Sequence, residues 1–269
     1  MKKFAFLFCA VVAALFFTAC GSSPKGYSVV DGVIVFDAPA RAEGQHSVLR
    51  LTTDPMPVVR VGFIGLGMRG PGAVERFTYL DGVEIKALCD LYPDRVEKSQ
   101  EILADRNLPA AAAYSGEEGW KELCRRDDID LVYICTPWQL HVPMAVYAME
   151  HGKHVAVEVP AAMSLEECWQ LVDTAEKTQR HCMMLENCVY DFFELTTLNM
   201  AQHGLFGEII HTEGSYIHDL DPFWEHYQGN WRLDFNQSHR GDVYATHGLG
   251  PACQLLDLSL IHIPSPRDA

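Results

Sequence analysis

The sequence predicts an α/β fold in which a doubly wound parallel sheet is followed by a second, α+β domain. Two observations predict the sheet. A β-branched apolar run at residues 58–64 leads straight into a glycine-rich turn at 65–70, and short apolar runs then alternate with helical patterns as far as residue 187. Alternating strands and helices are typical of βαβ units, which build parallel sheets with helices on both faces.

The glycine-rich turn, Gly65-Leu66-Gly67-Met68-Arg69-Gly70, has the Gly-x-Gly-x-x-Gly spacing of a dinucleotide-binding loop. Its glycines allow a tight turn and let the backbone approach a pyrophosphate, which lies at the N-terminus of the next helix. Such a hexapeptide is a weak signal by itself. Because it directly follows a predicted strand, it predicts a Rossmann domain over residues 58–187.

Asp90 is the second part of the cofactor signal. It ends the next strand-like run, 83–89, and lies twenty residues after Gly70. A carboxylate there can accept hydrogen bonds from the adenosine ribose hydroxyls, and its charge would repel a 2′-phosphate. The sequence therefore favours NAD over NADP. The alternative is an aspartate that only closes the strand into the turn at 92–94.

The remaining elements of this domain follow in order along the chain. Ser164 and Glu167 have the spacing of a capping box, which predicts a helix directly after Ser164. Gly152 is placed to end the helix before it. The other expected elements are helices at 73–80, 93–107, 120–126 and 142–151, and strands at 111–114, 131–135, 155–159 and 181–187.

Residues 188–269 differ in composition from the domain before them. A helical pattern at 192–204 precedes a strand-like stretch at 207–218 and a segment dense in aromatic residues, His, Asp and Arg. Such a segment suits the lining of a polar pocket better than a core. We expect the start of a substrate domain built on an open, mostly antiparallel sheet. We also expect this domain to be incomplete at residue 269, because strand edges of a half-built sheet would remain unpaired.

The first twenty residues are similar to a targeting segment. Two lysines precede an uncharged stretch, residues 4–19, and Cys20 follows it. This pattern resembles a bacterial lipoprotein signal in which Cys20 is lipidated, and ordinary secretion with cleavage near Ala19 is the alternative. We expect a protein of the cell envelope that contacts the membrane only through a lipid anchor at Cys20.

Residues 21–57 are rich in Gly, Ser, Pro and Ala, so we expect a tether and a lead-in that adds an edge strand at 29–36. The formal net charge of the whole chain is −15. An excess of negative charge disfavours binding to nucleic acid or to an anionic membrane surface. A neutral or small ligand suits this charge better, and formation of a homo-oligomer is left open.

Several ordered motifs resemble the glucose–fructose oxidoreductase (Gfo/Idh/MocA) superfamily. Thr136-Pro137 with His141, and Glu158-x-Pro160, stand at the ends of consecutive predicted strands behind the glycine loop. Within that superfamily, the chain is similar to glycoside hydrolase family 109, the NAD-dependent α-N-acetylgalactosaminidases. This closer resemblance is carried by Gly65-Leu66-Gly67-Met68-Arg69-Gly70-Pro71-Gly72, Cys89-Asp90-Leu91-Tyr92, Thr136-Pro137-Trp138-x-x-His141, Glu158-Val159-Pro160, Glu186-Asn187 and Tyr244-Ala245-Thr246-His247-Gly248.

The resemblance implies a glycosidase chemistry that depends on NAD. NAD⁺ would take hydride from C3 of a terminal α-linked N-acetylgalactosamine, a base would remove the acidified C2 proton, and the aglycone would leave by elimination. Water addition and return of the hydride would complete a reaction without net redox change. The superfamily's sugar dehydrogenases usually carry lysine between the Glu and the Pro, where this chain has Val159. The absence of this lysine disfavours net oxidation of the sugar.

The resemblance also implies a set of site residues. His247 and Tyr244 would transfer protons, and with Tyr216 and Arg232 they would bind the sugar. His218 and Tyr190 are weaker catalytic candidates. The residues that would bind NAD are Gly65, Gly67, Met68, Arg69, Asp90, Trp138, His141, Glu158, Val159 and Asn187.

Three alternatives to this interpretation are a metal site, a sugar oxidoreductase and a non-catalytic binding protein. The histidines and aspartates between residues 211 and 239 show no recognised metal-ligand spacing, so we expect no metal there. A sugar oxidoreductase would accumulate NADH, whereas the glycosidase would not. A non-catalytic NAD- or sugar-binding lipoprotein would keep its function when Tyr244 or His247 is replaced.

Overall fold

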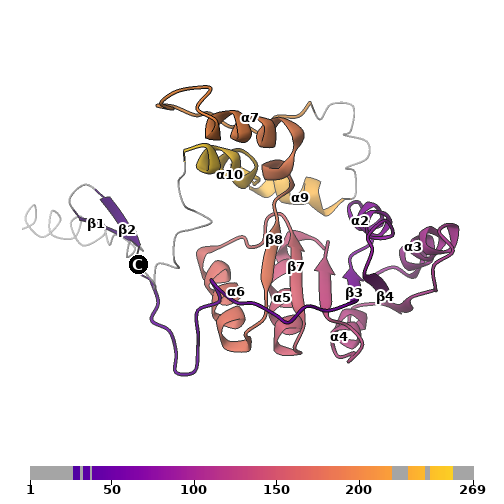
Figure 1. The fold of residues 1–269 in the computed structure, drawn as a ribbon. Helices are drawn as coiled ribbons and strands as arrows, with labels where there is room; N and C mark the ends of the chain where they lie inside the picture. The colour runs from indigo at the N-terminus through magenta and orange to yellow at the C-terminus, as the bar shows by residue number, and fades with distance from the viewer. Residues whose placement is uncertain (1–26, 31–32, 37, 220–229, 240–242, 257–269) are drawn as a thin grey trace, which may run out of the picture. The chain divides into compact units, whose positions relative to one another are not determined.

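The computed structural model describes most of the chain (Figure 1), namely residues 27–30, 33–36, 38–219, 230–239 and 243–256. The chain divides into two compact units, residues 1–40 with 266–269 and residues 41–265. The expected targeting segment and Cys20 lie outside the described residues. Lipidation of Cys20 therefore stays a prediction.

The described part of the first unit contains a two-stranded hairpin. Strands β1 (Tyr27–Val30) and β2 (Val33–Phe36) are antiparallel, with Tyr27 opposite Phe36. The prediction of one edge strand at 29–36 is wrong, because these strands pair with each other and not with the larger sheet. The sequence between them is Asp-Gly, a dipeptide that favours tight hairpins.

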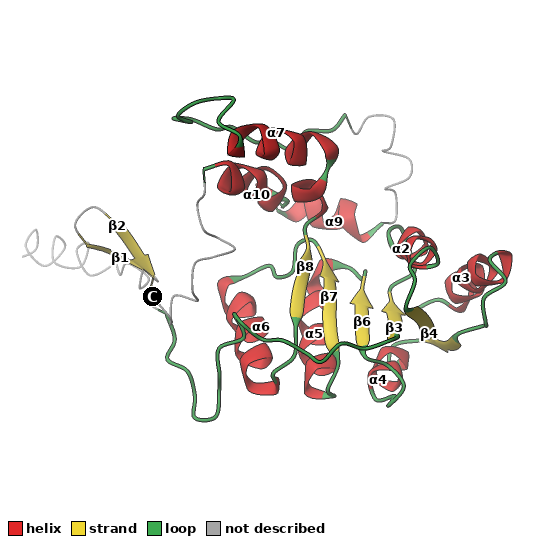
Figure 2. Ribbon diagram, viewed as in Figure 1, coloured by secondary structure: helices red, strands yellow, loops and turns green. Residues whose placement is uncertain are grey.

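The second unit contains the predicted doubly wound parallel sheet, which Figure 2 shows with its strands in yellow. The strand order is β5-β4-β3-β6-β7-β8, so the order reverses between β3 and β6. Ligands of such sheets bind beyond the carboxyl ends of the strands near this reversal. The strands are β3 (Val59–Ile64), β4 (Val83–Asp90), β5 (Ala112–Ser115), β6 (Leu131–Ile134), β7 (His154–Glu158) and β8 (Cys182–Leu185).

Helices cover both faces of this sheet, as the alternation in the sequence predicts. Val61 and Phe63 of β3 pack with helices α2 (Gly70–Phe77) and α3 (Pro93–Asp105) in one buried cluster. Ile64, whose side chain points the other way, belongs to a second cluster. That second cluster includes residues of α4 (Gly119–Cys124), α5 (His141–Glu150) and α6 (Leu165–Thr178).

The predicted capping box begins α6. The Ser164 hydroxyl accepts a hydrogen bond from the backbone N–H of Glu167 at 3.1 Å, and the Glu167 carboxylate accepts one from the N–H of Met163 at 2.7 Å. These bonds satisfy backbone donors that a helix N-terminus leaves free. Gly152 follows α5 with a φ of 79°, a left-handed conformation that glycine adopts without strain.

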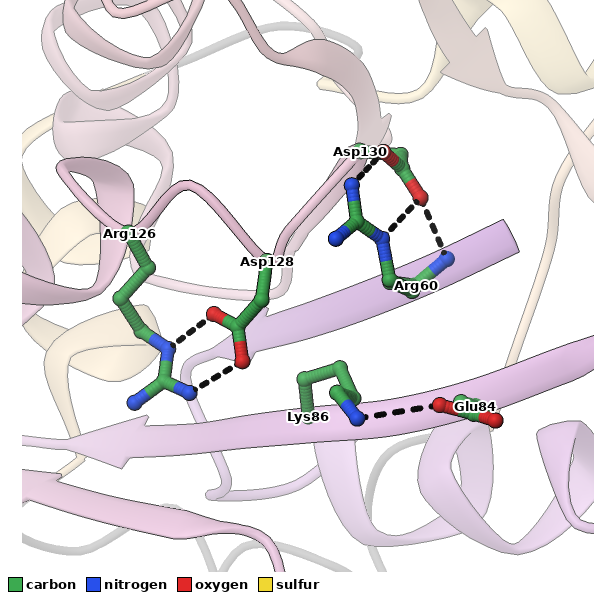
Figure 3. Close-up of polar contacts among 6 residues, drawn as sticks. All are labelled: Arg60, Glu84, Lys86, Arg126, Asp128 and Asp130. Atoms are coloured by element: carbon green, nitrogen blue, oxygen red, sulfur yellow. Dashed lines mark hydrogen bonds and ion pairs between the residues drawn. The ribbon is translucent and has the colours of Figure 1, made fainter. Parts of the chain in front are cut away.

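Two bidentate ion pairs lie at the amino-terminal ends of the strands (Figure 3). Arg60 donates to Asp130 through Nε at 2.8 Å and Nη2 at 2.6 Å, and its backbone N–H adds a third bond at 2.9 Å. These bonds hold the pKa of Asp130 below its usual range. Arg126 pairs with Asp128 in the same way, at 2.7 and 2.6 Å. Since ligands bind at the opposite ends of the strands, we assign these pairs to the fold.

The lead-in from residue 41 onward is attached to α6. Arg41 donates to both carboxylate oxygens of Glu176, at 3.1 and 3.0 Å, and the Glu176 side chain is only 1% exposed. The N–H of His46 also donates to the Glu176 carbonyl at 3.3 Å. Arg41 therefore forms an ion pair with a buried carboxylate of α6 that lies 135 positions later in the sequence.

The region after β8 is helical where it is described. It contains a short 3-10 helix, η2 (Asn187–Tyr190), and the helices α7 (Phe192–Gln202), α9 (Trp231–Ser238) and α10 (Ala245–Leu255). Figure 1 shows α7, α9 and α10 beyond the carboxyl ends of β7 and β8. Among the described residues, no helix is long and apolar enough to span a bilayer.

The strand predicted at 207–218 is wrong, because these residues form no regular element. Ile210 and Ile217 are 89% and 83% exposed, so their apolar side chains have no covering layer. A strand needs a neighbour for its backbone hydrogen bonds, and no described segment pairs with this one. The predicted open antiparallel sheet likewise has no counterpart among the described residues after β8.

Replacing Arg41 with alanine should lower the free energy of unfolding by roughly 3 kcal/mol, because the buried Glu176 carboxylate would lose the two charged hydrogen bonds from Arg41. Urea unfolding followed by tryptophan fluorescence measures this change. The matched control is Lys98→Ala, which removes an exposed partner of Asp94 and should cost less than about 0.5 kcal/mol. Equal effects of the two substitutions would contradict the role of Arg41.

Acid should destabilise the protein partly through His154. Burial lowers the pKa of this ring, and its Nδ1 accepts a hydrogen bond from the backbone N–H of His181 at 3.0 Å. An unfolded histidine binds its proton near pH ~6.5, so the stabilising neutral ring is fully present above that pH and its contribution is lost as the pH falls below it.

The variant His154→Asn keeps an acceptor and cannot titrate. It should therefore lose less stability between neutral pH and pH ~5 than the parent protein. Urea unfolding at a series of pH values measures the difference. An unchanged pH dependence would show that His154 is not one of the titrating groups.

Candidate functional site

A cavity of about 930 Å³ lies at the carboxyl ends of the strands, where the order of the sheet reverses. Its volume falls within the usual range for sites that enclose a small molecule. Every residue predicted to bind the cofactor or the sugar lines it: Gly65, Gly67, Met68, Arg69, Asp90, Trp138, His141, Glu158, Val159, Asn187, Tyr216, Arg232, Tyr244 and His247. The weaker candidates His218 and Tyr190 are not among the lining residues.

The glycine loop has no room for side chains at two of its positions. A Cβ at Gly65, whose φ is 93°, would lie 2.7 Å from the backbone carbon and oxygen of Cys135. A Cβ at Gly70 would lie 2.1 Å from the carbonyl oxygen of Gly65. The loop is thus folded tightly against the end of β6, and α2 begins at Gly70 with its N-terminus at this loop. This is the arrangement that binds a pyrophosphate.

Asp90 holds the glycine loop to the end of β4. Its carboxylate is buried and accepts hydrogen bonds from the N–H of Leu66 at 2.6 Å and of Tyr92 at 3.0 Å. Arg95 lies 3.4 Å from the same carboxylate and stacks over the Tyr92 ring at 4.7 Å. Both residues line the cavity, yet sequence analysis did not select Arg95, since nothing in its spacing distinguished it from other arginines of α3.

The cavity also contains a buried polar atom without a partner. The hydroxyl oxygen of Thr136 is inaccessible and makes no hydrogen bond within the described part of the chain. Thr136 follows β6, directly beside the glycine loop. The tight loop, the carboxylate of Asp90 and this hydroxyl together fit a dinucleotide such as NAD, since its phosphates and ribose hydroxyls need such partners.

His141 holds two turns of the cavity wall together. Its ring is 1% exposed, with Nδ1 2.7 Å from the carbonyl oxygen of Pro160 and Nε2 2.8 Å from that of Thr136. Burial lowers the pKa of this histidine. Each ring nitrogen lies at hydrogen-bond distance from a backbone carbonyl, and a neutral ring donates to one of the two, so His141 shapes the turns after β6 and β7. Direct contact with NAD stays a prediction.

Glu158 ends β7 and is positioned from two sides. The Tyr133 hydroxyl donates a hydrogen bond to it at 2.9 Å, and Arg69 of the glycine loop lies 3.9 Å from its other oxygen. Burial raises the pKa of Tyr133, so its hydroxyl keeps the proton that it donates. Val159 follows Glu158 in the sequence, is buried, and lines the cavity with an apolar side chain.

Trp138 joins the Rossmann domain to the helical region. It begins the short 3-10 helix η1 (Trp138–Leu140) and is 3% exposed. Its ring makes edge-to-face contacts with Trp231 and Phe235 of α9 and with Tyr244 beside α10, at 4.8, 4.9 and 5.4 Å between centroids. Such contacts favour one arrangement of α9 and α10 over the end of the sheet.

The four residues predicted to bind the sugar come together although they span 32 positions of the chain, 216–247. The ring of His247 is nearly parallel to that of Tyr244, 4.9 Å away, and lies 4.5 Å from that of Tyr216. Arg232 donates a hydrogen bond to the Tyr244 hydroxyl. Burial raises the pKa of Tyr244. The cluster therefore offers a histidine, a protonated phenol and a guanidinium at one end of the cavity.

Sequence analysis missed Glu186 as a site residue. It follows β8, is 8% exposed and lies at hydrogen-bond distance from Nδ1 of His247. Its position gave a usable signal, because Asp90 and Glu158 are also carboxylates at strand ends. Glu186, His247 and Cys188 form a group whose possible metal-ligand atoms lie within 4.8 Å of one another.

Comparison with known proteins agrees with this architecture. Residues 59–186 match the Gfo/Idh/MocA oxidoreductase family with its NAD-binding Rossmann fold, and residues 190–261 match the C-terminal domain of glycosyl hydrolase 109. An NAD-binding protein from Listeria innocua is similar in structure, with a TM-score of 0.50, 26% identity and coverage of 57% of this chain and 41% of that one. A scyllo-inositol dehydrogenase from Lactobacillus casei shares the fold, with a TM-score of 0.51, 18% identity and coverage of 56% and 43%.

The sheet, the glycine loop and these matches define the class: the chain carries an NAD-binding Rossmann domain of the Gfo/Idh/MocA type. Its sequence is 68% identical over 221 residues to glycosyl hydrolase family 109 protein 1 of Bacteroides fragilis, covering 82% of this chain and 48% of that protein. For the family 109 protein of Porphyromonas gingivalis the identity is 66% over 226 residues, with coverage of 84% and 48%.

The chain thus combines a Gfo/Idh/MocA Rossmann domain with a glycosyl hydrolase 109 C-terminal domain and is similar to proteins named as members of family 109, which confirms the resemblance seen in the motifs. It spans about half the length of these relatives, 48% in both cases.

Replacing Asp90 with alanine should weaken NAD binding about 10- to 100-fold, because a charged acceptor that holds the glycine loop is removed. Titration of the purified protein with NAD, followed by calorimetry, measures the dissociation constant. Asp94→Ala is the matched control, since Asp94 is an exposed carboxylate on α3 paired only with Lys98 among the interactions described. Equal affinities for the two variants would contradict the role of Asp90.

Proposed function

We propose that the protein is a glycosidase that removes terminal α-linked N-acetylgalactosamine and keeps NAD bound as a resident cofactor. When bound, NAD supplies a hydride acceptor and donor, which allows transient oxidation at C3 of the sugar. The observation that carries the proposal is one cavity lined both by the Rossmann loop and by the Tyr244–His247 pair. The identity to family 109 relatives supports the reaction class.

His247 is the proposed base. Its Nδ1 is hydrogen-bonded to a carboxylate, so Nε2 is the nitrogen left to accept the proton from C2 of the sugar. The His247 ring contacts two tyrosine rings, which favours one ring orientation and suits proton abstraction from a fixed carbon.

Tyr244 is the proposed acid. Burial raises the pKa of its phenol, so the hydroxyl stays protonated at neutral pH and can give its proton to the departing oxygen. The hydrogen bond from Arg232 places a positive charge beside the phenolate that this transfer leaves. We assign Arg232 and Tyr216 to holding the sugar.

Val159 sets this chain apart from the sugar dehydrogenases of the superfamily, and the proton of the C3 hydroxyl has to pass to another group in the cavity when the hydride leaves. In the superfamily's sugar dehydrogenases this position usually carries a lysine, whose role is to accept the hydroxyl proton. Here the side chain is a buried valine, with no ionisable group. The alternative is a sugar oxidoreductase with the same Rossmann domain, and that enzyme would accumulate NADH when given sugar.

The proposed location is the cell envelope, with a lipid anchor at Cys20. The support is in the sequence alone: two lysines, an uncharged stretch and a cysteine at the start of the chain. A glycan that ends in α-N-acetylgalactosamine is the proposed partner, and the net charge of −15 makes nucleic acid a poor one.

The test is hydrolysis of a chromogenic α-N-acetylgalactosaminide by the purified protein in heavy water. Elimination requires that C2 of the released sugar carry deuterium, which mass spectrometry and proton NMR detect. Release of the chromophore without deuterium at C2 would contradict the mechanism, and accumulation of NADH without release would favour the oxidoreductase. His247→Asn should abolish release, whereas His203→Asn, on an exposed histidine after α7, should not.

A further inference from the structure

We propose that Glu186 is a positioning residue for His247. Its carboxylate fixes which ring nitrogen carries the proton and leaves Nε2 free to act on the sugar. The inference rests on the proposed function in one respect, namely that the proton taken by His247 comes from C2 of the sugar. The contact between the two side chains does not depend on that function, so it can be tested separately.

The hydrogen bond decides the tautomer of His247. Nδ1 of the ring contacts Oε1 of Glu186, and both side chains are more than nine-tenths buried. An ionised carboxylate can only accept hydrogen bonds, so the shared proton belongs to Nδ1. Nε2 is then the basic nitrogen, and His247 lines the cavity while Glu186 lies behind it.

The charge of Glu186 is only partly compensated when the histidine is neutral. Oε1 also accepts a hydrogen bond from the N–H of Cys188 at 3.2 Å, whereas Oε2 is buried and has no partner in the described part of the chain. Burying an ionised carboxylate without partners costs free energy, and such a carboxylate attracts a positive charge strongly because the local dielectric constant is low. The imidazolium that forms when His247 takes a proton supplies that charge.

Close packing keeps the two side chains in place. Glu186 follows β8 and caps η2, and α10 carries His247. A Cβ at Gly250 of α10 would lie 2.5 Å from the Val189 side chain on η2, so the helix can approach η2 only because this residue is glycine. Tyr244 and Tyr216 both contact the histidine ring and also contact each other. The arrangement leaves the ring little freedom to rotate.

The other titratable or charged groups near the pair come from several elements, and a substitution at Glu186 leaves all of them in place. They are Cys188 on η2, Asp191 and Glu194 at the start of α7, Tyr244 at the start of α10, Tyr216 in the segment before α9, Arg232 on α9 and Arg69 of the glycine loop. A change in pH dependence after that substitution therefore reports on the Glu186 carboxylate itself.

The first experiment compares Glu186→Gln with Glu166→Gln, a matched change of an exposed glutamate on α6. The Glu186 variant should lose roughly 100-fold in kcat on the chromogenic glycoside while its Kd for NAD stays unchanged. The acid limb of its kcat/KM profile should move to lower pH, because imidazolium loses its carboxylate. Glu186→Asp, which keeps the charge, should recover part of the rate.

Equal rates and pH profiles for the Glu186→Gln and Glu166→Gln variants would overturn the proposal. A loss of NAD binding that matches the loss of rate would also overturn it, because Glu186 would then be a structural residue. Thermal unfolding of each variant confirms that the comparison is made between folded proteins.

The second experiment does not require activity. Nitrogen-15 NMR of histidine-labelled protein, assigned by the signal missing in His247→Asn, reports which ring nitrogen carries the proton. The proposal expects protonated Nδ1 in the parent protein and loss or redistribution of that proton in Glu186→Gln. An Nε2-protonated ring in the parent would overturn the proposal even if hydrolysis is seen. If the parent protein lacks glycosidase activity, the proposed function fails while this spectrum still decides the contact.

A third measurement separates the pair from a metal site. Glu186, Cys188 and His247 offer oxygen, sulfur and nitrogen ligands, which is a zinc-type donor set. Treatment with a chelator should leave the rate and the spectrum unchanged if a proton joins the pair. Loss of activity on chelation, restored by added zinc, would overturn the proposal.

Discussion

The close approach of Gly65 to the end of β6 is the constraint on which the site depends. The backbone of Gly65 passes so near Cys135 and Thr136 that a side chain there would overlap main-chain atoms. This approach holds the loop after β3 against the residues that follow β6, and Asp90 at the end of β4 fixes the loop through the N–H of Leu66. The cofactor end of the cavity is thus determined by backbone geometry more than by side-chain contacts.

The helical region supplies the other end of the cavity. Trp138, on the Rossmann side, packs against aromatic rings of α9 and beside α10, which places Tyr244 and His247 over the carboxyl ends of the strands. Neither region alone contains both a dinucleotide loop and a histidine backed by a carboxylate. In the proposed function, the Rossmann domain would hold the cofactor, and the residues after β8 would direct it toward hydrolysis.

The sheet and the cofactor end could be predicted from the sequence because their signals are local. Glycines at fixed spacing, Asp90 twenty residues later and the capping box at Ser164 each depend on near neighbours. The sugar-side residues came only from the family resemblance. The strand at 207–218 was wrong because a strand depends on its pairing partner, which a pattern of apolar residues cannot supply. Glu186 was missed because its role depends on contact with His247, 61 positions away, and its place after a strand does not reveal that contact.

The central claim is that a Rossmann cofactor and a proton-transferring histidine act on one sugar in one cavity. A single-turnover reaction of the NAD-loaded protein with glycoside, followed at the absorbance of reduced nicotinamide, tests it most directly. We expect the absorbance to rise and then return to its starting value as aglycone is released, and deuterium at C3 of the sugar should slow the rise. Release of aglycone without this transient would contradict the account.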